Sequence, residues 1–362
     1  MKKLLSTLVA AVMTVSCFTA CSGKTPAVSD DKIQIVTTIF PAYDWVMNVL
    51  GDNPAGAEVT MLLDNGADLH SFQPTAEDIL KITTGDMFVY VGGESDEWVD
   101  DILKEAVNKE MIVINLMDVL GDSVKEEEMV EGMQAEEHDH DHEDDEDRDH
   151  EHEDEDDHDE EDHDHEEEED HDHEHHHDHE EGEVEYDEHV WLSLKNAAVL
   201  TAKLSESIQT LDPANKDVYK KNADAYIEKL NSLDKEYQAA VDAGAVKTLL
   251  FGDRFPFRYL VDDYGLEYYA AFIGCSSESE ASFETITFLS KKVDELSLKA
   301  VLTIEGPDHK IAETIIENTF TKDQKILTMD SMQSTTAKDV EGGATYFSIM
   351  ENNLIVLKEA VK

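Results

Sequence analysis

Residues 214–241 read ANKDVYKKNADAYIEKLNSLDKEYQAAV, and this stretch sets the plan of the whole chain. Its apolar side chains recur at helical spacing, at Val218, Tyr219, Ala223, Tyr226, Ile227, Leu230, Leu233 and Tyr237. Since such a stripe packs against a core, the stretch predicts one long helix, and Pro213 suits its first turn. At 1.5 Å per residue the helix spans about 40 Å, enough to run the length of two domains.

On both sides of this helix, short β-rich runs alternate with helical patterns. Before it, strands and helices are predicted in turn at 33–38, 42–50, 58–63, 75–83, 87–91, 97–108, 111–116 and 196–211. After it, they are predicted in turn at 248–251, 258–264, 266–272, 283–296, 300–304, 310–319, 325–329 and 346–361. This alternation predicts an α/β fold with two lobes, each a mainly parallel sheet flanked by helices. Because ligands of open α/β sheets bind at the carboxyl ends of strands, we expect a binding cleft between the lobes.

An acidic, histidine-rich tract at residues 136–181 interrupts the first lobe. It contains 31 Asp or Glu, 14 His and the single Arg148, so it has no apolar side chain to bury and is expected to be disordered. Imidazole suits zinc, copper and nickel, and the carboxylates attract cations, so this composition favours metal capture over a plain solvated spacer. The auxiliary metal-binding histidines that we expect here are His163, His165, His171, His173, His175, His176, His177 and His179.

The chain is strongly acidic throughout. Its formal charge is −57, of which the tract contributes −30 and the remaining residues −27. Because the remainder is acidic too, we do not expect the protein to bind nucleic acid or to be drawn to anionic lipid by charge.

The N-terminus has the layout of a secretory signal. Lys2 and Lys3 precede the apolar run 4–15, which is too short for a stable transmembrane helix. Residues 18–21, Phe-Thr-Ala-Cys, are similar to a bacterial lipobox, with Phe where Leu is usual. The pattern predicts cleavage before Cys21 and lipid attachment to its thiol, which tethers the protein outside the membrane. A soluble secreted protein is the alternative.

These patterns divide the chain into a lipoprotein signal at 1–21, a linker at 22–31, an N-terminal lobe at 32–212 with a disordered insertion at 126–186, a linking helix at 213–241 and a C-terminal lobe at 242–362. With the Cys21 thiol lipidated, the mature chain keeps only Cys275 as a free thiol, so neither an internal disulfide nor a cysteine-rich zinc site is expected. No histidine base is adjacent to Cys275 in the sequence, and we interpret it as a buried small residue.

Two histidines outside the tract occupy loops that are expected to face the cleft. His70 lies in GADLHSFQP, residues 66–74, after the second predicted strand. His189 lies in YDEHVWLS, residues 186–193, where the tract ends and apolar residues resume. A lone histidine in a loop is usually just exposed, but two that face one cleft indicate a metal site.

Several spaced motifs agree on one family. The pattern His-x-Phe-x-Pro-Thr occurs at 70–75, Asp-x-His-Val-Trp-Leu-Ser occurs at 187–193, and Val-Gly-Gly at 91–93 leads to Trp98. With its histidine-rich insertion, the chain resembles, over residues 33–362, the metal-binding lipoproteins of bacterial ABC importers for zinc and manganese. The resemblance implies two lobes bridged by one long helix, and His70 and His189 as metal ligands. Glu188 stands where the family pattern has proline.

The remaining ligands are where this chain departs from the family pattern. The family usually has His, or Glu in manganese members, where this chain reads FGDRFPFRY at 251–259. Asp253 is the nearest residue with suitable chemistry, and an ion pair with Arg254 is the alternative role for it. Asp330 matches the family's usual fourth ligand position, with helix capping as its alternative role. Glu305, at the same edge of the second sheet, is a reserve ligand.

The sequence thus predicts an extracytoplasmic binding protein that captures Zn²⁺ in the cleft and delivers it to an ABC permease. We expect a monomer held at the bacterial cell membrane by its lipid anchor, without enzymatic activity. Two histidines with carboxylates also suit manganese or iron, and the tract favours zinc. The alternatives are a manganese or iron importer component, a secreted metallohydrolase with Glu305 as base, and a surface protein for metal buffering or adhesion.

Overall fold

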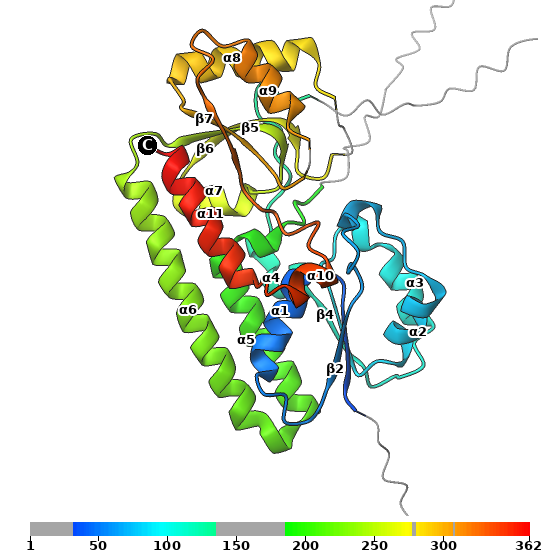
Figure 1. The fold of residues 1–362 in the computed structure, drawn as a ribbon. Coiled ribbons are helices and arrows are strands. Elements are labelled where there is room, and N and C mark those ends of the chain that lie inside the picture. Colours follow the sequence, from blue (N-terminus) through cyan, green and yellow to red (C-terminus); the bar gives the residue numbers. More distant parts are fainter. Residues whose placement is uncertain (1–31, 135–184, 277–279, 307) are drawn as a thin grey trace, which may run out of the picture. The chain divides into compact units, whose positions relative to one another are not determined.

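The computed structural model of the chain describes residues 32–134, 185–276, 280–306 and 308–362. The signal, Cys21, the linker and the tract histidines lie outside these ranges, so the expectations about them stay predictions. The described residues form two α/β lobes connected by a long helix, which confirms the expected fold class (Figure 1).

The N-terminal lobe is built on a parallel sheet with strand order β2-β1-β3-β4. Its strands are β1 (Gln34–Thr37), β2 (Glu58–Met61), β3 (Met87–Tyr90) and β4 (Ile112–Asn115). Its helices are α1 (Phe40–Leu50), α2 (Ala76–Thr84), α3 (Trp98–Lys104) and α4 (Leu116–Leu120). Every side chain of β3 is buried, as expected for an inner strand of a parallel sheet. Thr75 and Asp78 form a reciprocal capping box, which starts α2.

The C-terminal lobe repeats this plan with strand order β6-β5-β7-β8. Its strands are β5 (Thr248–Phe255), β6 (Glu267–Ile273), β7 (Ala300–Thr303) and β8 (Lys325–Thr328). Its helices are α7 (Arg258–Tyr264), α8 (Phe283–Leu296), α9 (Lys310–Glu317) and α11 (Tyr346–Ala360). The short α10 (Ala337–Glu341) lies against the N-terminal lobe, where the N–H of Ala337 donates to the carbonyl of Asp64 (Figure 1).

One strand is longer than predicted, and this moves a candidate ligand. The apolar run of β5 is interrupted after Phe251, where the register shifts, but pairing with β6 resumes at Arg254. Asp253 therefore lies inside the strand and not beyond its end.

The long helix is confirmed as α6 (Lys216–Ala243), which packs beside α5 (Leu194–Leu211), α1 and α11 (Figure 1). Most of the predicted stripe is buried, but Val218 is 42% exposed. Pro213 begins a separate 3-10 turn before α6, so it does not occupy the first turn of the helix itself.

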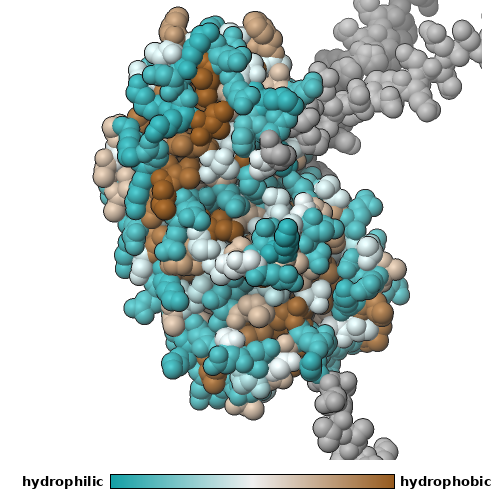
Figure 2. Space-filling model, viewed as in Figure 1, coloured by the Kyte–Doolittle hydropathy of each residue, from teal (hydrophilic) through white to brown (hydrophobic). Residues whose placement is uncertain are grey.

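One hydrophobic cluster is shared by the two lobes. It joins Trp45 of α1, Leu230 of α6 and Leu357 of α11, among many others. The lobes are therefore held together by packing as well as by the chain. On the surface, hydrophilic side chains cover most of the face in Figure 2, and hydrophobic ones appear as separate patches. A membrane-spanning segment is not found among the helices that the structure describes.

The base of the insertion is more ordered than predicted. Residues 126–134 belong to the described part of the chain, although they were expected to be disordered. Val130 and Met133 pack against the core, and this apolar content explains the order. On the returning side, Tyr186 pairs with Glu126 in an isolated antiparallel bridge.

Two positions on α6 test its burial pattern. Leu230 is fully buried, so Leu230→Ala should lower the free energy of unfolding by about 2–5 kcal/mol through lost burial and a new cavity. Val218→Ala, on the exposed side of the same helix, is the matched control and should change it by less than about 0.5 kcal/mol. Urea denaturation measures both. Equal losses in the two variants would contradict this placement of α6.

Candidate metal centre

His70 lies on a 3-10 turn (Leu69–Ser71) that follows β2 and starts at Asp68. The Asp68 carboxylate accepts the backbone N–H of His70 at 3.1 Å, which fixes the turn. The Nδ1 atom of His70 lies 2.8 Å from the Ser95 hydroxyl and 3.4 Å from a carboxylate oxygen of Glu188. These oxygens hold the ring with its Nε2 atom directed away from them.

His189 is fully buried just before α5. The Asp187 carboxylate accepts both the backbone N–H of His189 at 2.8 Å and its Nδ1–H at 3.0 Å. Two residues on, the indole N–H of Trp191 donates to the carbonyl of Ser331 at 2.8 Å. The His189 loop is therefore fixed both within itself and against the C-terminal lobe.

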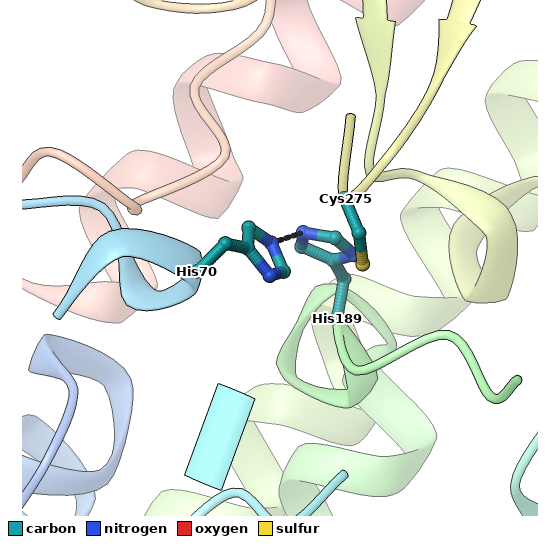
Figure 3. A group of neighbouring side chains, drawn as sticks. All are labelled: His70, His189 and Cys275. Atoms are coloured by element: carbon teal, nitrogen blue, oxygen red, sulfur yellow. Dashed lines mark hydrogen bonds between the residues drawn. The ribbon is translucent and has the colours of Figure 1, made fainter. Parts of the chain in front are cut away.

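The two imidazoles face each other, with their Nε2 atoms 3.3 Å apart (Figure 3). Since the oxygen partners lie at both Nδ1 atoms, the ring protons belong there and both Nε2 atoms present lone pairs. Two nitrogens bound to one tetrahedral zinc at about 2.0–2.1 Å stand roughly 3.3–3.4 Å apart. The spacing of the pair therefore suits one zinc ion.

Cys275 lies beside this pair, next to His189 (Figure 3). One donor atom each from His70, His189 and Cys275 lie within 4.8 Å of one another. Burial, with the nearby charge of Glu127, raises the pKa of the Cys275 thiol well above its usual range. The fold thus supplies the neighbouring histidine that the local sequence lacks, and the interpretation of Cys275 as a buried small residue stays a prediction.

Comparison with known proteins assigns the family. The family model described as ZnuA, zinc-uptake complex component A periplasmic, matches residues 35–360. The chain belongs to this family. The zinc-binding lipoprotein AdcA of Streptococcus pneumoniae (strain ATCC BAA-255 / R6) is 30% identical over 342 residues, covering 94% of this chain and 58% of that protein. The high-affinity zinc uptake system protein ZnuA of Bacillus subtilis (strain 168) is 27% identical over 331 residues, covering 91% of this chain and 88% of that protein.

A solved structure agrees with this family assignment. The Zn(II)-bound ZnuA-like domain of Streptococcus pneumoniae AdcA is similar with a TM-score of 0.63 and 26% identity, covering 91% of this chain and 99% of that domain. The chain spans little more than half the length of its AdcA relatives.

The structure does not bring Asp253, the expected third ligand, to the histidine pair. The Asp253 carboxylate accepts the backbone N–H groups of Arg254 at 2.9 Å and Ile304 at 3.2 Å, and burial raises its pKa. The guanidinium of Arg254 pairs with Asp68 at 2.9 Å, and the ion pair with Asp253, the alternative role of that residue, is not formed. The Asp253 carboxylate thus links β5 to the residue that follows β7 in the same lobe.

The two other predicted carboxylates also lie outside the three-residue group. Asp330 accepts the backbone N–H of Met332 at 2.8 Å, and burial together with the charge of Glu305 raises its pKa to about 6. Glu305 accepts backbone N–H groups from Ser331 at 2.6 Å and Gln333 at 3.1 Å. Both carboxylates therefore hold a loop in place, because backbone donors of that loop surround them.

Two residues that the sequence did not single out contact the pair. The side-chain Nε2 of Gln333 lies 2.7 Å from Nε2 of His189 and 3.3 Å from Nε2 of His70. Glu188 was noted only as a departure from proline, and its carboxylate also accepts the backbone N–H of Ser95 at 2.8 Å. Gly93 makes room for it, since a Cβ there would lie 2.3 Å from the Glu188 carboxylate and its φ is +80°.

The charges around His70 shift its pKa in the opposite direction to burial. Burial lowers the pKa of His70, but the hydrogen bond to Glu188 and the charges of Asp68 and Glu188 outweigh it, so the net shift is upward. Burial raises the pKa of Glu188, and its bonds to His70 and Ser95 reverse the sign. Nearby Asp96 is raised to a pKa of about 7, mainly by burial. Protonated His70 thus stabilises the metal-free fold at low pH, and this contribution is lost as pH rises through its folded pKa.

The substitution Glu188→Gln tests this arrangement. It should lower the pKa of His70 in the metal-free protein, because the amide keeps the size of the side chain and removes its charge. An NMR titration of the His70 ring proton measures the shift, and the zinc-binding pH threshold should move down with it. The exposed Glu97→Gln is the control. An unchanged His70 pKa in Glu188→Gln would contradict the assigned contact.

Proposed function

We propose that this protein captures Zn²⁺ outside the cytoplasmic membrane and delivers it to an ABC permease. The observation that carries the proposal is the pair of facing imidazoles. His70 and His189 present Nε2 lone pairs 3.3 Å apart, and each ring is oriented through Nδ1 by an oxygen partner. Such outer partners are the usual support of metal-ligating histidines.

The donor set favours zinc over manganese. Two imidazoles and a neighbouring thiol are nitrogen and sulfur donors, which suit zinc, whereas manganese prefers oxygen. The carboxylates of Asp253 and Asp330, which would favour manganese or iron, are engaged by backbone N–H groups. Relatives named as a zinc-binding lipoprotein and as a zinc uptake system protein support the same cargo.

The proposed activity is binding, not catalysis. A catalytic zinc needs an open position for water and a base near it. His189 is fully buried, and the Gln333 amide lies against the Nε2 atoms of both imidazoles. Glu305, the base expected for a hydrolase, is engaged by the loop that carries Gln333. The family's description as a zinc-uptake component agrees with a binding role.

The rest of the chain extends this role. Lipid on Cys21 would anchor the monomer beside its permease, and a relative named as a lipoprotein supports such an anchor. The 14 histidines of the tract would raise the zinc concentration near the cleft and exchange ions faster than one buried site. The division into signal, linker, two lobes and linking helix belongs to the same proposal.

Zinc titration calorimetry on protein lacking residues 1–21 and 136–181 tests the site directly. We expect one zinc ion to bind tightly. His70→Ala or His189→Ala should lower the zinc affinity by at least ~100-fold, because losing a residue that only hydrogen-bonds to a ligand already costs about 10–100-fold in affinity. His309→Ala is the matched control, because it removes an imidazole outside the group. Unchanged zinc affinity in both ligand variants would reject the site.

Removing the tract separates the two metal-binding parts of the chain. Protein lacking only residues 136–181 should lose its weak, multiple zinc sites and keep one tight site, because the tight ligands are on the lobes. Zinc stoichiometry by equilibrium dialysis, beside the full chain, measures this. Loss of all tight binding would favour the metal-buffering alternative, and tight manganese with weak zinc would favour the manganese importer.

A further inference from the structure

The side-chain amide of Gln333 borders the space that a metal would take beside the two imidazole Nε2 atoms. Gln333 lies in the loop between β8 and α10, is 9% exposed, and directs its amide at both Nε2 atoms. Because the partners of His70 and His189 place the ring protons on Nδ1, each Nε2 has a lone pair to be satisfied. The two hydrogens of the amide group match these two lone pairs. Without them, two acceptors would face each other at 3.3 Å in a largely buried space.

The loop that carries Gln333 is held firmly. The carboxylate of Glu305 accepts the backbone N–H of Ser331 at 2.6 Å, its hydroxyl at 2.8 Å, and the backbone N–H of Gln333 at 3.1 Å. Met332, between them, has a φ of +65°, a strained conformation that persists only where the surroundings impose it. The position of the amide is therefore built into the fold.

The amide has a second orientation with partners on both sides. In the structure, the Ser331 hydroxyl lies 3.2 Å from the carbonyl oxygen of the Gln333 side chain. A half-turn about the last side-chain torsion would place the NH₂ group toward that hydroxyl, which can also accept. The same half-turn would present the carbonyl oxygen to the space between His70 and His189. Amide oxygens coordinate divalent metals in other sites.

We propose that Gln333 closes the empty site by donating to both histidines and, after a half-turn of its amide, becomes an oxygen ligand of the bound zinc. This inference rests on the proposed function and adds a regulation to the same site. Zinc must replace two hydrogen bonds to enter, and the neutral oxygen that then binds it is a weaker partner than a carboxylate. The site is thereby tuned for release of its cargo as well as for capture.

The full chain, in metal-free and zinc-loaded form, allows the test. Glutamine is labelled with ¹⁵N, and the side-chain NH₂ signals of Gln333 are assigned by their absence in Gln333→Leu. In the metal-free protein these NH₂ hydrogens should be protected from exchange with solvent. Their signals should shift when zinc is added. Competition with a chelator measures the zinc affinity of the tight site apart from the weak sites of the tract. Gln333→Leu should lower this affinity by ~10-fold, and Gln333→Glu should raise it. Gln238→Leu, on the exposed face of α6, is the control.

The outcomes separate this inference from the proposed function. If zinc leaves the Gln333 signals unmoved and Gln333→Leu binds zinc as tightly as the unaltered chain, Gln333 is not a ligand and the inference is overturned. The proposed function survives that result as long as the His70 and His189 variants lose tight binding. Should Gln333→Leu fail to fold, the zinc-induced shift in the unaltered chain and the affinity of Gln333→Glu still decide the question.

Discussion

Two acceptor nitrogens held 3.3 Å apart in a largely buried space are the constraint around which the rest of this protein is arranged. Lone pairs at that distance repel each other unless a cation or a pair of hydrogens stands between them. The orientation is imposed from behind, by Asp187 on one ring and by Ser95 and Glu188 on the other. The fold therefore stabilises an arrangement that an isolated pair of histidines would avoid.

The lobes are tied together close to this pair. The hydroxyl of Tyr346, at the start of α11, donates to the carbonyl of Trp191 at 2.7 Å, and the Trp191 indole reaches Ser331. From α7, the hydroxyl of Tyr259 donates to the carbonyl of Asp187 at 2.7 Å. All these contacts are buried, and each joins the His189 loop to the C-terminal lobe. Combined with the shared hydrophobic cluster, they favour small local movements of the loops over a wide opening of the lobes.

The sequence predicts the fold and the histidine pair well because hydrophobic periodicity and loop motifs are both local patterns. Periodicity places the strands and α6, and the loop motifs identify His70 and His189, which the structure brings together. The missed features depend on contacts between distant segments. Arg254 pairs with Asp68, which is 186 positions away, and Gln333 reaches His70 across 263 positions. A glutamine or a lone cysteine has no local pattern that marks it as a partner of a metal site. Asp253 was predicted as the carboxylate nearest to the family's usual ligand position, and β5 extends beyond it.

The bridge between Glu126 and Tyr186 bears on the evolution of the chain. It closes the base of the insertion three positions before His189, so the path of the site loop is set there. Doubling the length of a loop adds only about 0.6 kcal/mol of closure entropy. A change in the length of the tract at 136–181 should therefore cost little free energy of folding. The number of histidines in the tract can then change while the bridge keeps the path of the loop that carries His189.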